Sequence, residues 1–216
     1  MGAQRYTAGQ TEILLYYGEP SPYSTKQEIY IDLIPRESYV NPGVWQIILT
    51  PRRIVSGAYE MWLPTEGILN RGTGFLFPTK STTLTIPSTA GRVITVGAYD
   101  ALTFAYADFS GRGPLAMEST GIAKPDLAAP GANVRTTAVG GGYVTVSGTS
   151  FATPFVTGSA ALLMEWGIIK GNDPYLYGEK VKAYLRRGAR KLPGFDVYPN
   201  PQVGYGALCV KDSLPL

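Results

Sequence analysis

Residues 147–154 read SGTSFATP, and this stretch decides how the second half of the chain is expected to fold. A short β-branched run, Tyr143–Val146, precedes it, and apolar residues recur after it at three- and four-residue steps from Ala152 to Trp166. That spacing places one apolar face along a helix. The stretch is therefore predicted to be the turn at which a strand becomes a long buried helix, which stops at Gly167.

Ser150 lies at the predicted start of this helix. The first backbone N–H groups of a helix have no partner within it, and they lie at the positive end of its dipole. Such groups stabilise the oxyanion that forms when a hydroxyl attacks a carbonyl, so Ser150 is a candidate nucleophile. Gly148 would let a substrate backbone approach closely. The alternative is an ordinary helix cap, in which Thr149 or Ser150 only satisfies those N–H groups.

Outward from this turn, the sequence from about residue 84 onward indicates an α/β region. Arg92–Ala98 (RVITVGA) is a continuous apolar run, typical of a strand that is covered on both faces. Val134–Ala138 and Tyr143–Val146 indicate shorter strands. A second helix is predicted over Pro174–Arg187, because proline suits a first helical turn and basic residues suit a last one.

The preceding region reads as strands with no helical period between them. In Gln27–Ile34, apolar residues alternate with polar ones, which places the apolar set on one face of a strand. Further β-branched and aromatic runs are Ile13–Tyr17, Val44–Leu49 and Tyr59–Leu63. Short, closely spaced strands favour an antiparallel, jelly-roll-like sandwich. The sequence thus predicts two domains, an all-β sandwich over residues 5–82 and an α/β domain over residues 83–216.

The residue totals exclude several kinds of site. The 216 residues include no histidine and a single cysteine, Cys209, so an internal disulfide, a histidine or cysteine metal cluster and an imidazole base are all excluded within the chain. The net charge of +3 is dispersed, which argues against nucleic acid as a partner. We expect no membrane span, and residues 1–5 lack the apolar core of a signal peptide, which indicates an internal start.

Four blocks of the second region resemble the subtilase family of serine proteases, in the order in which that family has them. The blocks are Arg92–Asp100 (RVITVGAYD), Asp108–Pro114 (DFSGRGP), Lys124–Val134 (KPDLAAPGANV) and Gly148–Pro154 (GTSFATP). The last block matches the family's nucleophile signature, Gly-Thr-Ser-x-Ala-x-Pro, which favours Ser150 as a nucleophile over a helix cap. The resemblance implies that residues 83–216 form the C-terminal half of a subtilisin-like parallel-sheet domain.

The resemblance also implies an activity and its site. A subtilase is a serine endopeptidase that hydrolyses protein or peptide substrates through an acyl-enzyme, here at Ser150, whose backbone N–H forms part of the oxyanion hole. Ser147, Gly148 and Thr149 are expected to line the leaving-group side of the cleft. The family order is Asp, His, oxyanion-hole Asn and Ser, so the first three are expected in an N-terminal part, and this chain alone is expected to be inactive. Neither a cofactor nor a metal is implied.

The first region resembles the β-sandwich that is inserted in the catalytic domain of clostridial spore-germination proteases. Spaced residues carry this likeness: Trp45, Gly57, Tyr59, Trp62, Leu63 and Pro64. The two tryptophans are expected in the sandwich core, and a stacking platform for sugar or peptide is the alternative. An extracytoplasmic or spore-associated location is suggested by the resemblance alone.

Other interpretations stay open at this stage. A Ser–Lys dyad or a sedolisin-like upstream Glu would supply a different base, although Lys124 and Asp126 match a structural loop of the subtilases. A pseudoprotease or binding module that acts through the β-sandwich is the main rival. A third hypothesis is that two separate halves assemble into one enzyme. It predicts an unpaired sheet edge and an apolar face, through which an isolated half would self-associate.

Overall fold

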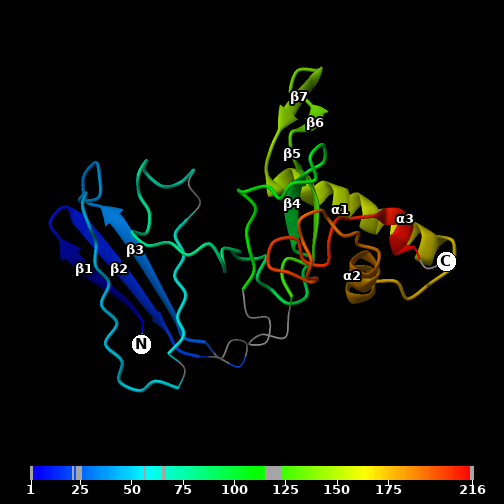
Figure 1. Ribbon diagram of the computed structural model, residues 1–216. Coiled ribbons are helices and arrows are strands. Elements are labelled where there is room, and N and C mark those ends of the chain that lie inside the picture. Colours follow the sequence, from blue (N-terminus) through cyan, green and yellow to red (C-terminus); the bar gives the residue numbers. More distant parts are fainter. Residues whose placement is uncertain are drawn as a thin grey trace. The chain divides into compact units, whose positions relative to one another are not determined.

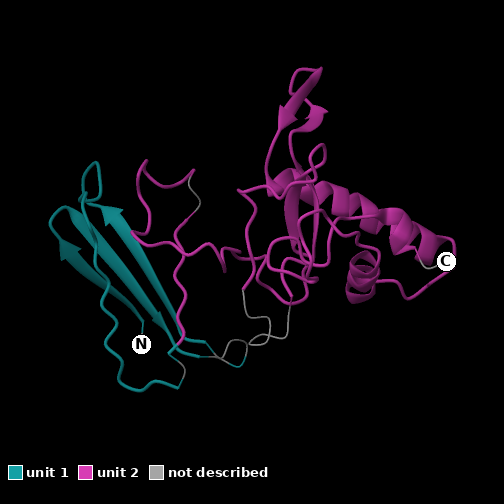
Figure 2. Ribbon diagram, in the orientation of Figure 1, with its two compact units in different colours: residues 1–57 teal, residues 58–216 magenta. Residues whose placement is uncertain are grey.

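The computed structural model describes residues 2–20, 22, 26–55, 57–64, 67–114 and 123–214. The chain divides into two compact units, residues 1–57 and residues 58–216, which Figure 2 shows in different colours. The division predicted from the sequence, at residues 82 and 83, is a division by fold class and stays a prediction.

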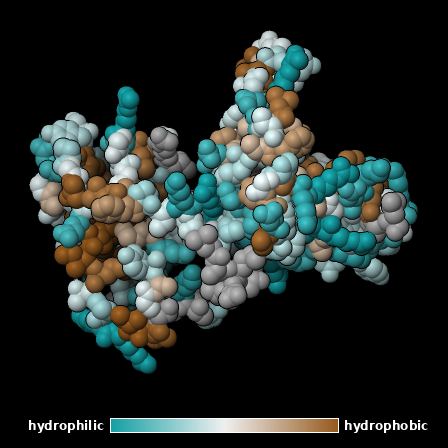
Figure 3. Space-filling view, viewed as in Figure 1, coloured by the Kyte–Doolittle hydropathy of each residue, from teal (hydrophilic) through white to brown (hydrophobic). Residues whose placement is uncertain are grey.

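Unit 1 is built on an antiparallel three-stranded meander of β1 (Ala3–Ala8), β2 (Thr11–Gly18) and β3 (Glu28–Pro35), as Figure 1 shows. The strands predicted over Ile13–Tyr17 and Gln27–Ile34 are confirmed. Directly paired residues share a face, so Tyr6, Ile13 and Leu33 form one row of an apolar face. Figure 3 shows apolar side chains gathered over this unit.

The strands predicted over Val44–Leu49 and Tyr59–Leu63 are wrong, because neither segment forms a regular strand. Val44 is 79% exposed and Ile48 is 75% exposed. A β-branched run favours an extended backbone, but a strand also needs a neighbour for its N–H and C=O groups. No described segment pairs with either run.

Unit 2 holds the parallel pair β4 (Val96–Asp100) and β5 (Leu127–Ala132). The predicted strand Arg92–Ala98 is confirmed in part, since its regular portion begins at Val96. Ala98 and Leu127 are fully buried, as expected for strands that are covered by other elements. The strands predicted at Val134–Ala138 and Tyr143–Val146 form the antiparallel hairpin of β6 (Val134–Thr137) and β7 (Tyr143–Val146).

The predicted long helix is α1 (Thr149–Met164), which packs against β4 and β5. It does not stop at Gly167, because a π-helical segment, η2 (Glu165–Ile169), continues it. The role of Gly167 is close packing: a Cβ there would lie 2.6 Å from Leu176 Cδ2. Proteins use glycine where two segments approach this closely.

By length and composition, the continuous helix Thr149–Ile169 could cross a membrane, since it has 21 residues and contains an 18-residue window with a mean hydropathy of 1.2. The expectation that no run is long enough is therefore wrong on this criterion. Buried core helices of water-soluble domains meet the same criterion, and α1 contributes Ala152, Val156 and Leu163 to the core of unit 2.

Two further helices complete unit 2. The second predicted helix is α2 (Gly178–Arg187), which begins four residues after Pro174. Asp173 accepts hydrogen bonds from Lys180 Nζ (2.6 Å) and Tyr184 Oη (2.8 Å), which ties the preceding loop to this helix. The last helix, α3 (Val210–Ser213), is joined to the segment after α2 by an Arg190–Asp212 ion pair.

Candidate active site

Ser150 is exposed at the second position of α1. The residue that precedes the helix is Gly148, with a φ of +154°, and no side chain caps the helix. The cap interpretation of Thr149 and Ser150 is therefore wrong: both residues lie inside the helix. Glycine suits position 148 because side-chain-bearing residues rarely adopt this φ.

The N–H groups at the start of α1 are free to bind a ligand. Among the described residues, neither the Thr149 nor the Ser150 N–H donates a hydrogen bond, whereas the Phe151 N–H bonds Gly148 O at 3.0 Å. No acidic side chain lies in the first turn to neutralise the helix dipole. Oriented N–H groups and a positive helix end favour developing negative charge beside the Ser150 hydroxyl.

The turn before α1 is held against β5. The Gly148 N–H donates to Gly131 O at 2.7 Å. Gly131 has no room for a side chain, since a Cβ there would lie 2.6 Å from Ala98 Cβ and 3.1 Å from Ala152 Cβ. The small residues in Lys124–Val134 and Gly148–Pro154 thus allow helix and strands to approach closely, which places Ser150 at the end of β5.

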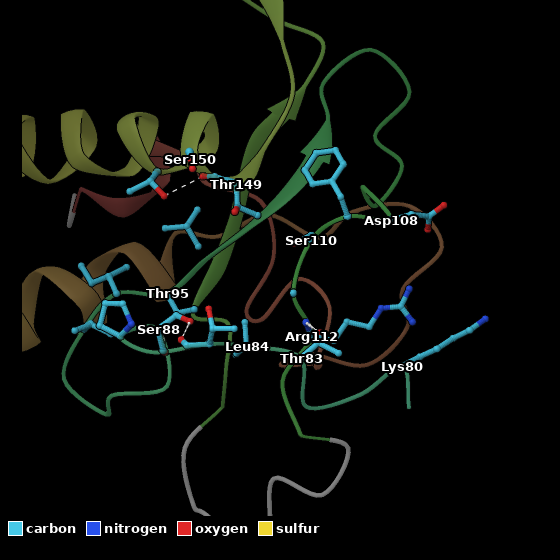
Figure 4. Close-up of a pocket in the computed structure, with 18 residues that line it drawn as sticks. Lys80, Thr83, Leu84, Ser88, Thr95, Asp108, Ser110, Arg112, Thr149 and Ser150 are labelled. Carbon is cyan, nitrogen blue, oxygen red and sulfur yellow. Dashed lines mark hydrogen bonds between the residues drawn. The ribbon is translucent and has the colours of Figure 1, made fainter. Parts of the chain in front are cut away.

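Ser150 opens onto a cavity of about 910 Å³ (Figure 4). The cavity is lined by the first turn of α1 and by segments 83–88, 93–96 and 108–112. Of the residues predicted beside the nucleophile, Thr149 lines this cavity with Ser150, while Ser147 and Gly148 do not. Ser147 is exposed, and its Oγ accepts a hydrogen bond from the Asn133 N–H at 3.0 Å.

The charged residues of the cavity do not reach Ser150. Figure 4 shows Lys80, Asp108 and Arg112 on the far side of the cavity, with their charged groups directed away from the serine. Lys124 is not a base for Ser150 either, because its ammonium is buried and donates to Val93 O, Thr95 Oγ1 and Asp126 Oδ2. The described residues therefore offer no Ser–Lys dyad.

Asp126 is the centre of a buried ionic cluster. Its carboxylate is fully buried and contacts Lys124 (3.1 Å), Lys182 (3.4 Å) and Arg186, and it accepts the Thr95 N–H at 2.6 Å. Burial lowers the pKa of Lys124, although the neighbouring carboxylate opposes this. The cluster joins α2 to both strands.

The sequence did not reveal this cluster. The sequence predicts Arg186 only as one of the basic residues in the last turn of a helix, whereas in the structure its side chain is partly buried against the Asp126 carboxylate. The spacing of Lys182 and Arg186 by four residues, on the face of α2 that also carries Leu185, was the available signal. No group of histidine, cysteine, aspartate and glutamate side chains that could hold a metal ion occurs in the part of the chain that the structure describes.

Comparison with known proteins agrees with the resemblance seen in the sequence blocks around Ser150. The family model described as "Subtilase family", Peptidase_S8, matches residues 70–206. Serine protease AprX of Bacillus subtilis is 36% identical over 155 residues, which cover 62% of this chain and 32% of AprX. The PII-type proteinase of Lactococcus lactis subsp. cremoris is 43% identical over 75 residues, 35% of this chain and 4% of that protein.

A solved structure extends the likeness to nearly the whole chain. The structure of the Clostridium perfringens CspB protease matches with a TM-score of 0.77 and 39% sequence identity, over 98% of this chain and 44% of that one. The chain thus spans about a third of AprX and less than half of CspB.

Proposed function

Because the chain belongs to the subtilase family of serine proteases, we propose that it is the part of a serine endopeptidase that carries the nucleophile, Ser150. The observation that carries this proposal is the state of Ser150 at the start of α1. Its hydroxyl is exposed to a large cavity, it does not cap the helix, and two free N–H groups lie beside it. A serine that only capped the start of a helix would need neither a cavity in front of its hydroxyl nor free N–H groups beside it.

In the proposed reaction, the Ser150 oxygen attacks the carbonyl carbon of a peptide bond while an imidazole takes the hydroxyl proton. The Ser150 N–H donates to the resulting oxyanion. The imidazolium then protonates the leaving amine, the C–N bond breaks, and water hydrolyses the acyl-enzyme by the same steps. Thr149, which lines the cavity beside Ser150, contacts the leaving-group side of the substrate.

The imidazole, the aspartate that orients it and the oxyanion-hole asparagine come from an N-terminal part of the protein. This chain contains no histidine, so alone it has an unactivated hydroxyl and is inactive toward peptides. Protein or peptide substrates follow from the family.

The outer edge of β4 supports a docking place for that N-terminal part. Ala98 faces away from β5, since its N–H bonds Ser110 Oγ (2.9 Å) and its C=O bonds the Ala107 N–H (3.1 Å). Val96 has the same orientation by strand alternation, yet no such partner among the described residues. A further parallel strand would pair here, along the wall of the cavity. Without it, the same edge would mediate self-association of the isolated chain, which a monodisperse monomer in solution scattering would contradict.

A second support is the uncovered apolar face of α1. Phe155 and Leu162 lie seven residues apart in α1 and are 43% and 55% exposed. These positions lie on one side of a helix. A core helix of a parallel-sheet domain is normally covered, and the proposed N-terminal part would cover this side.

We also propose that residues 5–82 complete a jelly-roll-like β-sandwich when that part is present. The β1–β3 sheet has an apolar face, and Val44–Leu49 and Tyr59–Leu63 are apolar runs without strand neighbours. The match to CspB includes this region, because it covers 98% of the chain.

A fluorophosphonate probe tests the proposed function, because it reacts only with an activated serine. We expect it to label the full-length protein, to fail to label a full-length Ser150→Ala variant, and to fail to label this chain alone. Labelling of the isolated chain would contradict the missing-base proposal. An unlabelled full-length protein would contradict the protease proposal.

A further inference from the structure

Asn133, directly after β5, has an unusual backbone conformation. Its φ is +55°, in the left-handed region that residues other than glycine seldom occupy. Asparagine tolerates this region better than most residues, because its short amide can form local hydrogen bonds. The conformation costs free energy unless neighbouring contacts hold it, so the contacts of Asn133 are informative.

Asn133 bonds two segments that are far apart in sequence. Its side-chain Nδ2 donates to Asp100 Oδ2 at 2.9 Å, and its backbone N–H donates to Ser147 Oγ at 3.0 Å. Asp100 ends β4, and Ser147 lies three residues before Ser150. A chain of two hydrogen bonds therefore runs from the end of one parallel strand to the turn that carries the nucleophile.

The Asp100 carboxylate is itself fixed. Its Oδ1 accepts the Leu102 N–H at 2.8 Å and the Thr103 N–H at 3.3 Å, so its Oδ2 is directed at Asn133. Hydrogen bonds from the Leu102 N–H and the Asn133 amide hold the pKa of Asp100 below its ordinary value, so the group remains charged near neutral pH. A charged acceptor makes the bond to the amide stronger than a neutral one would.

The turn before α1 thus has two tethers to the end of β5. One is the Gly148–Gly131 backbone bond, which needs no side chain. The other, from Asn133 to Ser147, depends on the Asn133 side chain, because that side chain holds the backbone that presents the N–H. The β6–β7 ladder, which begins at the Val134–Val146 pair, holds the strand that leads into the turn, and the bonds to Gly148 and Ser147 hold the turn itself against the end of β5.

We propose that Asn133 and Asp100 are positioning residues for Ser150, which act through the Ser147 hydroxyl and contact neither substrate nor the reacting atoms. This rests on the proposed function of Ser150 as a nucleophile. Attack requires the Ser150 oxygen to lie within a narrow range of distance and angle from the carbonyl carbon, and a displacement of about 1 Å costs on the order of 100-fold in rate. The two residues act on the chemical step and not on substrate affinity.

A reciprocal exchange in the full-length protein tests this role. Asn133→Asp places two carboxylates together and removes the amide donor, so we expect kcat and the fluorophosphonate labelling rate to fall by about 10–100-fold with KM unchanged. Adding Asp100→Asn to that variant restores one donor and one acceptor in reversed order, and we expect most of the rate to return. A double variant no faster than the single one would overturn the proposal.

A control separates positioning from stability. Tyr184→Phe removes a hydrogen bond of similar length, that of Tyr184 Oη to Asp173, from a part of unit 2 outside the turn. We expect this variant to label at the wild-type rate even where its melting temperature falls as far as that of Asn133→Asp. Equal labelling losses for the two variants would overturn the positioning role.

Three further outcomes are distinguishable. If Asn133→Asp fails to fold, Asn133→Gly decides, because glycine adopts a φ of +55° without strain and removes only the amide bond. A wild-type kcat in that variant would overturn the proposal. If the wild-type protein labels and no Asn133 variant is slowed, only the positioning role fails. A wild-type protein that does not label contradicts the proposed function, and the positioning role with it.

Discussion

The two units of the chain differ in how they bury apolar side chains. In unit 2, Leu127, Leu163, Leu176 and Leu185 are fully buried around one parallel strand pair. In unit 1, no large apolar side chain among the described residues is buried, and the one fully buried residue is Thr11, whose hydroxyl bonds Asn41. Both units contain the apolar runs that a folded core needs.

The difference shows what a run of apolar residues can establish alone. In unit 2, β4, β6, β7, α1 and α2 form where the sequence predicts them, because each finds a packing or pairing partner within the chain. The run Tyr59–Leu63, which has no strand neighbour, is the exception in this unit. In unit 1, three strands pair and the run Val44–Leu49 remains uncovered. Apolar alternation predicts that a segment can join a sheet, but the neighbouring strand must exist before it does. We attribute the missing neighbours to the proposed N-terminal part.

The largest difference between the units is expected in how much free energy of unfolding is lost when the carboxylate of an ion pair is removed. Asp126→Asn in unit 2 leaves buried cations without their carboxylate, so we expect a loss of about 3–5 kcal/mol in the free energy of unfolding. Glu12→Gln in unit 1 breaks an exposed pair with Arg5 and should cost less than about 1 kcal/mol. Urea unfolding followed by circular dichroism measures both. If Asp126→Asn also costs less than about 1 kcal/mol, the Asp126 cluster does not stabilise unit 2.

Truncation of apolar side chains sharpens the comparison. Leu163→Ala, at a fully buried position, should cost about 2–5 kcal/mol in any form of the protein. Ile48→Ala should cost less than about 0.5 kcal/mol in the isolated chain, where Ile48 is largely exposed. In the full-length protein we expect the cost of Ile48→Ala to rise toward the roughly 2–5 kcal/mol of a buried position. An unchanged small loss there would contradict the proposed sandwich.

The smallest expected effect is a loss of stability of unit 2 at acid pH. Hydrogen bonds from Lys180, and then from Tyr184, lower the pKa of Asp173 below its ordinary 3.8. A lowered carboxyl pKa adds stability above the unfolded value, and this is lost as the pH falls through the folded value. Below about pH 4 we therefore expect unit 2 to lose stability, as followed by thermal melts.

Tyr184→Phe removes one of these bonds, so the acid-side loss should become smaller. Tyr175→Phe is the matched control, because only the backbone of Tyr175 contacts Asp173 and its ring is 77% exposed. If the Tyr184→Phe variant loses stability at acid pH as the wild type does, the Tyr184 hydrogen bond is not a cause of the lowered pKa of Asp173.

Most of the α/β fold could be predicted because its signals are local. The period of three and four residues in α1, the apolar run at β4 and the family blocks around Ser150 each lie within one continuous segment. The Asp126 cluster and the Asp100–Asn133–Ser147 chain were missed because their members are brought together only by the fold. Gly167 was misread as a helix stop because the sequence does not show the close approach of Leu176.

The central claim is that Ser150 is the activated nucleophile, and the most direct test is to locate the probe by mass spectrometry. The full-length protein is labelled with a fluorophosphonate and digested with trypsin, which releases residues 136–170 as one peptide if cleavage follows Arg135 and Lys170. Fragmentation of that peptide also distinguishes Ser150 from Ser147 and Ser159. We predict that the adduct lies on Ser150. An adduct on another serine, or no adduct, would contradict the account.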